Sequence, residues 1–232
     1  MTARMSGRRL AVILGLTALP VFLTSAALRL VASPPGAVAP GRLRPPYRDF
    51  AVYALANWIT LALVVRVAGW HSLHAWGLRA RMSRWSGVSA CAGFVIGLAI
   101  YMAVSAALRR LGLPPIRGMA FASPTAFELA VMFFSVVVTA AFCEEVFFRV
   151  LWVGALRSFA PAWMTAVASI AAFAAIHYPY FGPGGVLFIS VWALVPLGLF
   201  LWFGDCTASI AMHMMNNAFA YLLVPVLFAV PK

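Results

Sequence analysis

The fold is decided by residues 127–156, FELAVMFFSVVVTAAFCEEVFFRVLWVGAL, a run that carries only four formal charges. A helix needs about 20 apolar residues to cross the hydrocarbon core of a bilayer, and this run exceeds that length. Backbone groups in lipid must bond internally, which leaves helices or a closed barrel. Because the run lacks the alternation of apolar and polar residues that barrel strands show, it predicts a transmembrane α-helix.

Apolar runs recur along the whole chain. Of its 232 residues, 64% are hydrophobic and only 9% are charged, a balance that no water-soluble domain of this size keeps in solution. The predicted fold class is all-α, a polytopic transmembrane helical bundle. We expect seven spans, within a range of six to eight, at residues 10–28, 50–65, 88–108, 127–156, 162–177, 184–203 and 207–230.

The net charge of +12 does not indicate a nucleic-acid partner. The arginines stand at span ends and in short loops, such as residues 42–48 and 79–84, where they meet anionic lipid headgroups. Cationic residues flank the first span on both sides, so the positive-inside rule leaves the membrane orientation open.

Turn residues divide the runs, and the cysteines carry no chemistry of their own. Proline lacks a donor and glycine relaxes the backbone, so breaks are predicted at Ser33–Gly36, Pro114–Pro115, Pro161 and Gly182–Gly185. The cysteines show neither CxxC spacing nor the density of a disulfide framework. Each is expected to be a small buried hydrophobe: Cys91, Cys143 and Cys206.

Two adjacent acidic residues lie inside the quoted run. Glu144 and Glu145 are two of only five acidic residues in the chain, and an ionisable group at the bilayer centre costs about 2.5–3.5 kcal/mol on insertion scales. They should therefore face the bundle interior or a water-filled cavity. Glu145 shares a helical face with Arg149, four residues on, whereas Glu144 points about 100° away. We expect Arg149 to hold Glu145; a purely structural ion pair is the simpler alternative.

Two histidines lie in the nearly uncharged second half. His177 ends the 162–177 run one turn after Phe173, whose ring can form the wall beside the imidazole. His213 and Asn217, four residues apart in the last run, share a helical face, and interhelical hydrogen bonding is the simpler explanation for both. Counted from the nearest turns at ~1.5 Å per residue, Glu144 and His177 lie at ~22–24 Å, but His213 at only ~12 Å, a shortfall that tilt must absorb.

Three segments in this order, Glu144-Glu145-x-x-x-Arg149, Phe173-x-x-x-His177 and His213-x-x-x-Asn217, resemble the motifs of the CAAX protease and bacteriocin-processing family of intramembrane proteases, which includes type II CAAX prenyl endopeptidases. The likeness covers roughly residues 125–225. It implies a bundle with a water-accessible cavity that cuts substrates near the membrane surface. It also divides the chain into a variable N-terminal transmembrane region of about three spans, residues 1–120, and a catalytic helical core, residues 121–232.

The resemblance leads to a hypothesis about the chemistry. Glu144 with His177 deprotonates a water that attacks the scissile carbonyl, and His213 and Asn217 donate to the oxyanion. This mechanism commits to no cofactor. Its rival is a metalloprotease site in which Glu144, His177 and His213 bind Zn²⁺ and leave a fourth position for water. The chain contains no HExxH segment to decide between them.

Two functions without peptide hydrolysis also fit these residues. Relatives in the family serve as immunity or scaffold proteins, and buried acids occur in ion or proton carriers. Sixteen arginines against one lysine resemble the usage of a high-GC bacterium, so we expect a multi-pass protein of a bacterial plasma membrane. Its expected partners are the lipid bilayer and a membrane-associated protein or peptide substrate. Substrate identity and oligomeric state stay open.

Overall fold

The computed structural model describes residues 6–30, 47–79, 81–116 and 124–228, and the regular elements in these ranges are all helices. Six helical segments are long and apolar enough to cross a membrane: Gly7–Leu28, Tyr47–Ala68, Arg84–Arg110, Ala126–Ser158, Ala162–Phe203 and Thr207–Leu227. The predicted all-α transmembrane bundle is confirmed, with a span count inside the expected range. The chain is a multi-pass integral membrane protein.

The spans are built from the following elements. The first contains α1 (Gly7–Leu16) and α2 (Leu19–Leu30), the second is α3 (Tyr47–Ala68), and α4 (Trp70–Ala75) leads to the third, α5 (Arg84–Arg110). The fourth, here called the central helix, joins α6 (Ala126–Met132), η1 (Phe133–Ala140), α7 (Ala141–Glu145), η2 (Val146–Ala155) and η3 (Leu156–Ser158). The fifth contains α8 (Ala162–Trp192) and α9 (Leu194–Phe203), and the sixth contains α10 (Thr207–Ala218), η4 (Phe219–Leu223) and α11 (Val224–Phe228).

The structure joins two predicted spans, 162–177 and 184–203, into one kinked segment of 42 residues. The bend lies at Gly182, whose φ of 65° and ψ of −170° fall outside the helical region. Glycine adopts such a conformation without a Cβ penalty, and Pro183 cannot donate across the bend. At ~1.5 Å per residue the segment is ~63 Å long, about two bilayer cores. The fifth and sixth predicted spans are therefore the two halves of this one segment, which accounts for six segments where seven spans were predicted.

The other predicted breaks have different outcomes. Pro161 stands directly before α8, and Pro114–Pro115 follow the end of α5, as expected. The turn at Ser33–Gly36 and the domain boundary at residue 120 lie outside the described residues, so both stay predictions.

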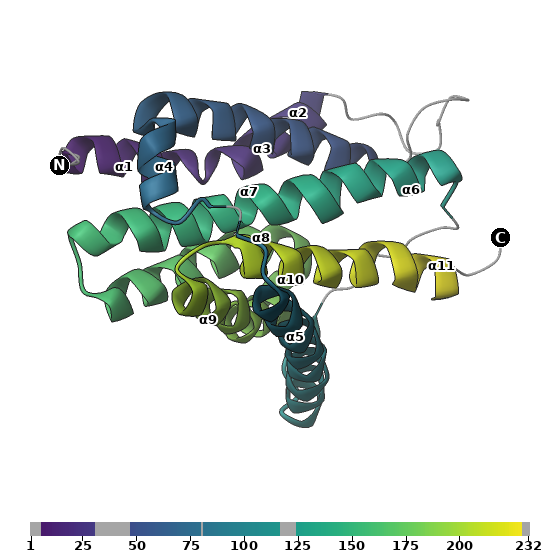
Figure 1. Ribbon diagram of the computed structural model, residues 1–232. Helices are drawn as coiled ribbons and strands as arrows, with labels where there is room; N and C mark the ends of the chain where they lie inside the picture. The colour runs from purple at the N-terminus through teal and green to yellow at the C-terminus, as the bar shows by residue number, and fades with distance from the viewer. Residues whose placement is uncertain (1–5, 31–46, 80, 117–123, 229–232) are drawn as a thin grey trace.

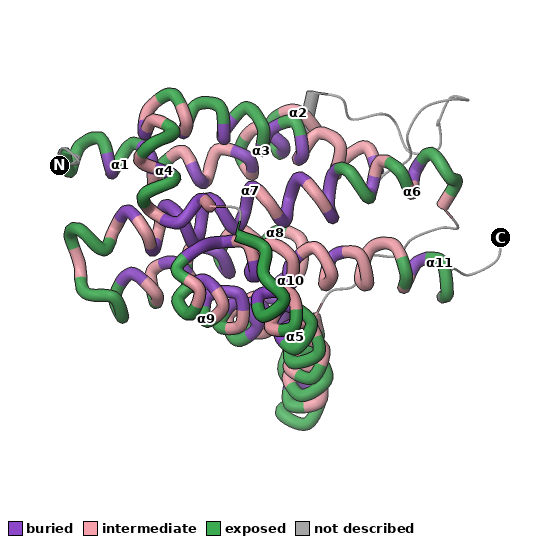
Figure 2. The backbone as a smooth tube through the Cα atoms, in the orientation of Figure 1, coloured by how far each residue is buried: buried purple, intermediate pink, exposed green. Residues whose placement is uncertain are grey.

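The central helix lies in the middle of the bundle. In its most apolar stretch 50% of the residues are buried inside the protein, whereas the corresponding share in the other five spans is 17–33%. α3 packs against η1, α8 against η2, and α10 against both η1 and α7. In Figure 1 the helices α1 to α3 run above the central helix, α10 and α11 run below it, and α5 crosses at a steep angle. Figure 2 shows buried residues gathered where these helices meet, so a side chain at this point is enclosed by several elements.

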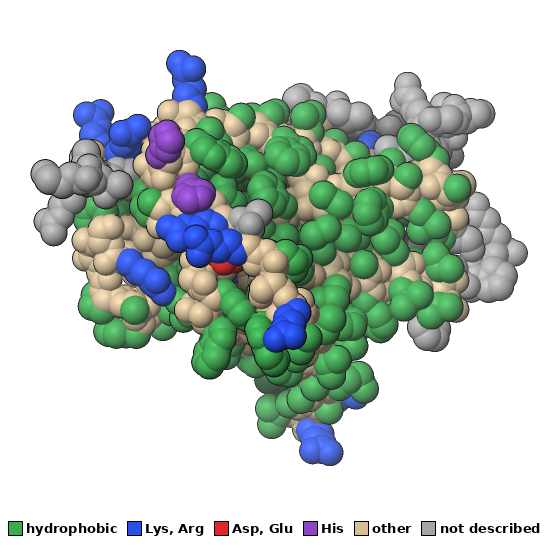
Figure 3. Space-filling view, viewed as in Figure 1, with side chains coloured by type: hydrophobic (Ala, Val, Ile, Leu, Met, Phe, Trp, Pro, Cys, Tyr) green, Lys and Arg blue, Asp and Glu red, His purple; other side chains and the backbone are tan. Residues whose placement is uncertain are grey.

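Large apolar side chains cover much of the outer surface (Figure 3). Trp202 is 84% exposed and Phe22 70%, as is expected where the surrounding medium is lipid. Cys143 and Cys206 are buried as predicted, but Cys91 is exposed, so the prediction for Cys91 is wrong. Its apolar neighbours locate it in a span, yet a weakly polar thiol is also stable on a lipid-facing surface.

The turn between α9 and α10 is partly covered by protein, although Gly204 is exposed. Asp205 and Cys206 are buried, and the backbone N–H of Cys206 donates to the carbonyl of Gly77 at 3.1 Å. The segment that contains Gly77 is itself seated on the central helix, where Gly154 meets the backbone of Trp76 so closely that any Cβ would overlap it. The residues just before α10 are therefore covered by the segment that contains Gly77.

Candidate active site

Glu145 and Arg149 form a buried ion pair on the central helix. Glu145 Oε2 lies 3.3 Å from Arg149 Nε, and the two side chains are 0% and 1% exposed. The guanidinium also lies over the ring of Phe173, 4.7 Å from its centroid. The pair expected from the four-residue spacing is therefore present, and Phe173 ties it to α8.

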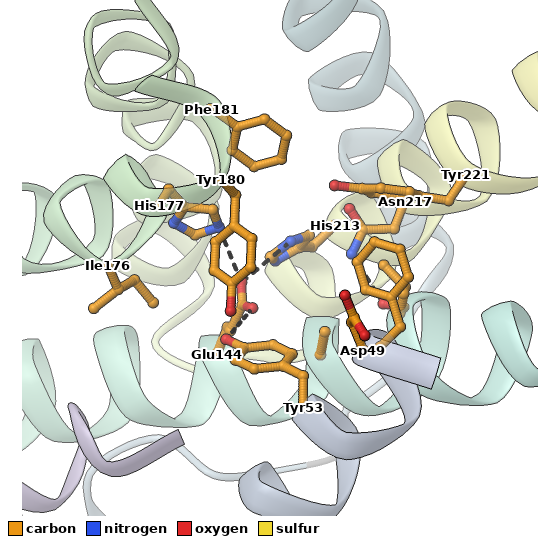
Figure 4. Close-up of a pocket in the computed structure, with 13 residues that line it drawn as sticks. Asp49, Tyr53, Glu144, Ile176, His177, Tyr180, Phe181, His213, Asn217 and Tyr221 are labelled. Atoms are coloured by element: carbon orange, nitrogen blue, oxygen red, sulfur yellow. Dashed lines mark hydrogen bonds and ion pairs between the residues drawn. The ribbon is translucent and has the colours of Figure 1, made fainter. Parts of the chain in front are cut away.

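Glu144 points away from this pair into a cavity (Figure 4). Its Oε1 accepts a hydrogen bond from the Tyr53 hydroxyl at 2.9 Å. Its Oε2 lies 3.9 Å from Nε2 of His177 and 3.8 Å from Nε2 of His213. The central helix, α8 and α10 thus bring together the three titratable groups singled out from the sequence, and α3 adds a hydroxyl.

The His177 ring is fixed by its own helix. Its Nδ1 lies 2.7 Å from the carbonyl oxygen of Phe173, and the ring packs between Phe173 and Phe181, at centroid distances of 4.6 and 5.9 Å. A carbonyl oxygen only accepts, so Nδ1 carries the proton. In the neutral ring Nε2 then presents its lone pair towards Glu144.

The His213 ring is fixed in the same sense by Glu145. Its Nδ1 lies 2.9 Å from Glu145 Oε1, and Trp192 packs edge-on against it at 5.0 Å between centroids. A carboxylate held by Arg149 accepts only, so here too Nδ1 donates, and in the neutral ring Nε2 faces Glu144 as an acceptor. Glu145 therefore has a second partner that the sequence reasoning did not anticipate.

Three acceptor atoms converge in this arrangement: Glu144 Oε2 and the two Nε2 atoms. Acceptors do not bond to one another, and a water O–H, a proton or a cation is what satisfies them. Groups placed in this way can bind a water and take its proton.

Asn217 also borders the cavity. Its Nδ2 donates to the carbonyl of Val136 at 3.0 Å, which leaves the second N–H of the amide for another acceptor. All six residues expected at the site are therefore close together. Five of them have polar partners on other helices, and Arg149 pairs with Glu145 of its own helix.

The cavity measures about 110 Å³, enough for several water molecules. It is lined by Asp49, Phe50, Tyr53, Val136, Ala140, Glu144, Ile176, His177, Tyr180, Phe181, His213, Asn217 and Tyr221. Sequence reasoning missed the contribution of α3. The available signal was Tyr53 and Asn57, two polar residues four apart inside an apolar run, as His213 and Asn217 are.

The expected zinc ligands, Glu144, His177 and His213, are residue types that bind zinc, but their ligand atoms lie further apart than in a zinc site. Zinc ligand atoms lie about 2.0–2.2 Å from the metal, hence roughly 3.3–3.5 Å from one another in a tetrahedron. The Nε2 atoms lie 3.9 and 3.8 Å from Glu144 Oε2. Across the described ranges, no group of three or more His, Cys, Asp and Glu side chains is positioned to hold a metal ion. The zinc ligand set stays a prediction.

The buried cysteines offer no nucleophile. Burial raises the pKa of the Cys206 thiol to about 12, so it stays protonated at neutral pH. Cys143 is next to Glu144 in sequence but fully buried, and neither thiol lines the cavity.

One comparison with known proteins gives a match. Residues 126–219 match the family model described as type II CAAX prenyl endopeptidase Rce1-like. No curated protein and no solved structure matches the chain. The matched segment agrees with the resemblance drawn from the three motifs, and it includes Glu144, His177 and His213 but not Tyr53.

Proposed function

Residues 126–219 form an Rce1-like domain, and from this premise we infer that the protein is an intramembrane endopeptidase. Its proposed reaction is hydrolysis of a peptide bond in a membrane-associated protein or peptide. One observation carries the proposal: within the cavity, Glu144 Oε2 lies less than 4 Å from the Nε2 atoms of both His177 and His213.

In the proposed mechanism Glu144 is the general base. A water between Glu144 and His177 donates one O–H to Oε2 and the other to Nε2, which orients an oxygen lone pair towards the scissile carbonyl. Glu144 takes the proton as the oxygen attacks, and returns it to the leaving amine. Phe173 holds the His177 tautomer that this step needs.

Asn217 and His213 are the proposed oxyanion donors, His213 only in molecules whose ring already carries a proton on both nitrogens before the water attacks. Asn217 contributes the N–H that is not bound to Val136. His213 Nε2 accepts in the neutral ring, so it becomes a donor only when the ring is protonated. Glu145 fixes the orientation of this ring, because its carboxylate lies 2.9 Å from Nδ1. Removing one oxyanion donor typically lowers turnover by about 10²–10³-fold.

The zinc mechanism is the second candidate, because both histidines donate through Nδ1 to a fixed acceptor, as metal-ligating histidines do. We favour the glutamate mechanism on the spacing of the three ligand atoms, and derive no step through a metal. Cleavage by the purified protein is expected to survive dialysis against a chelator. A loss of cleavage that added Zn²⁺ restores would overturn the glutamate mechanism and leave the endopeptidase function intact.

The proposed substrate belongs to a bacterial plasma membrane, given the arginine-rich composition. In that setting leader peptides and membrane-attached proteins are the proposed class, rather than prenylated tails. The cavity lies within a bundle whose outer surface is apolar, so a substrate that is already in the bilayer or at its surface reaches it most directly.

His177→Ala provides the test of function. Cells that carry this variant in place of the natural protein are expected to lack at least one cleavage product in their membrane fraction, measured by mass spectrometry of new peptide ends. The variant removes one water acceptor but leaves the Glu145–Arg149 pair in place.

The outcomes separate the three functions. An unchanged set of peptide ends, together with an unchanged cellular phenotype, would favour the scaffold or immunity function. Ion or proton flux in liposomes that His177→Ala abolishes, with no cleavage product, would favour the carrier.

A further inference from the structure

The catalytic carboxylate of the proposed endopeptidase is held by a residue outside the Rce1-like domain. We propose that Tyr53, on α3, is a positioning residue that fixes the Glu144 carboxylate with Oε2 towards the two histidines. The inference rests on the proposed function and deepens it. Its basis is the Tyr53 hydroxyl, which donates to Glu144 Oε1 at 2.9 Å.

Glu144 needs such a donor because neither imidazole lies within hydrogen-bond distance of its carboxylate. The Nε2 atoms of His177 and His213 lie 3.9 and 3.8 Å from Oε2, beyond hydrogen-bond distance. In the tautomers set by the Phe173 carbonyl and by Glu145, both present lone pairs. Among the described residues, Tyr53 is thus the group with a hydrogen bond to this carboxylate, and a bond to one oxygen fixes the direction of the other.

Tyr53 is itself held firmly. Its ring packs edge-to-face against Tyr180 of α8, at 6.4 Å between centroids. Its backbone carbonyl accepts from the side chain of Asn57 at 2.9 Å. A phenol has few rotatable bonds, so little freedom is lost when it keeps one orientation. These contacts connect α3 and α8 on either side of the carboxylate.

A purely structural hydrogen bond is the alternative, and the chain contains one for comparison. Trp58 Nε1 donates to Thr139 Oγ1 at 3.1 Å, again from α3 to the central helix. Trp58 does not line the cavity. If the Tyr53 bond only joins the two helices, removing either bond should have the same effect.

Tyr53→Phe is expected to lower kcat by roughly 10- to 100-fold with little change in KM, the range typical of a lost hydrogen bond to a charged group. Trp58→Phe is the matched control and is expected to keep kcat within about twofold. The assay uses a quenched-fluorescent peptide made from the cleavage site found by the membrane-fraction comparison, with proteins reconstituted in liposomes. An unchanged kcat in Tyr53→Phe, or an equal fall in Trp58→Phe, would refute the proposal.

A double variant tests whether Tyr53 acts through Glu144. In Glu144→Asp the shorter side chain cannot reach the Tyr53 hydroxyl, so adding Tyr53→Phe should change the remaining kcat by less than about twofold. Independent, multiplicative effects would mean that Tyr53 acts elsewhere.

A measurement without turnover separates this inference from the proposed function. The infrared carboxylate band that disappears in Glu144→Gln should shift in Tyr53→Phe and stay in place in Trp58→Phe. If the band shifts but neither the wild-type protein nor any variant cleaves a peptide, the proposed function is wrong, whereas the hydrogen bond between Tyr53 and Glu144 is confirmed. If the band does not shift in Tyr53→Phe, the proposed positioning role of Tyr53 is wrong, whatever activity the variant has.

Discussion

Glutamine in place of Glu144 is expected to lower the cleavage rate by about 10²–10⁴-fold, the contribution typical of a general base. The amide has nearly the shape of the carboxylate, and its oxygen can still accept from Tyr53. It cannot take a proton from water, and its NH₂ group would donate towards the histidine Nε2 atoms instead of sharing a water with them. Single-turnover cleavage in liposomes measures the effect.

Glu128→Gln is the matched control for this variant. Glu128 is a further buried carboxylate of the central helix, where it caps α6 together with Thr125. Glutamine is equally suited to such a capping box, so cleavage should stay near the wild-type rate. More than a tenth of the rate remaining in Glu144→Gln would mean that another group is the base.

The largest effect on stability is expected for Arg149→Met. It leaves Glu145, which is 0% exposed, without its cationic partner in a site that water does not reach. Breaking a buried pair by removing one partner costs about 3–5 kcal/mol. We expect a low yield of folded protein and a clear fall in the thermal unfolding midpoint in detergent.

The double variant Glu145→Gln, Arg149→Met tests whether Arg149→Met destabilises the protein through the unpaired charge of Glu145 or through lost packing of the arginine side chain. Removing both charges together is far less costly than removing one, so the folded yield should largely return. Cleavage should stay low, because His213 loses the carboxylate that orients its ring. An Arg149→Met protein that unfolds at the wild-type temperature would show that the pair does not hold the bundle.

The spans were predictable because backbone groups in lipid must form hydrogen bonds within the protein. Long apolar runs without alternation are therefore helices. The kink at Gly182 was visible as Gly182–Gly185 but was interpreted as a loop between spans. Composition marks where a helix is interrupted; it does not say whether the chain leaves the membrane there. That depends on what packs around the bend.

The site was predictable in its residues and less so in its geometry. The four-residue spacing of Glu145 and Arg149 is local, so helix periodicity alone predicts their contact. The depth of His213 is not local. Counting from the turn at Gly204 put it ~10 Å short, yet its Nε2 lies 3.8 Å from Glu144 Oε2. The count assumed a turn at the membrane surface, whereas Asp205 and Cys206 are buried beneath the segment that contains Gly77.

The role of α3 was missed for a different reason. The three motifs all fall in the second half of the chain. Tyr53 lies in the first half, inside an apolar run, and belongs to none of them. A hydroxyl that donates to another helix leaves only a local signal in one sequence, here Tyr53 and Asn57 four residues apart, and that signal does not identify its partner. The same holds for the imidazole tautomers, which follow from the partners of each Nδ1 and not from the residues next to it in the chain.

The position of α3 has a consequence for how such proteins diversify. Asp49, Phe50 and Tyr53 line the cavity from a segment that lies outside the Rce1-like match. Substitutions in α3 can therefore alter one side of the proposed peptide-binding cavity while the glutamate and both imidazoles stay unchanged. Grafting this helix between homologues should transfer preference for a target and leave the reaction rate unchanged only where both helices carry a tyrosine at the position of Tyr53.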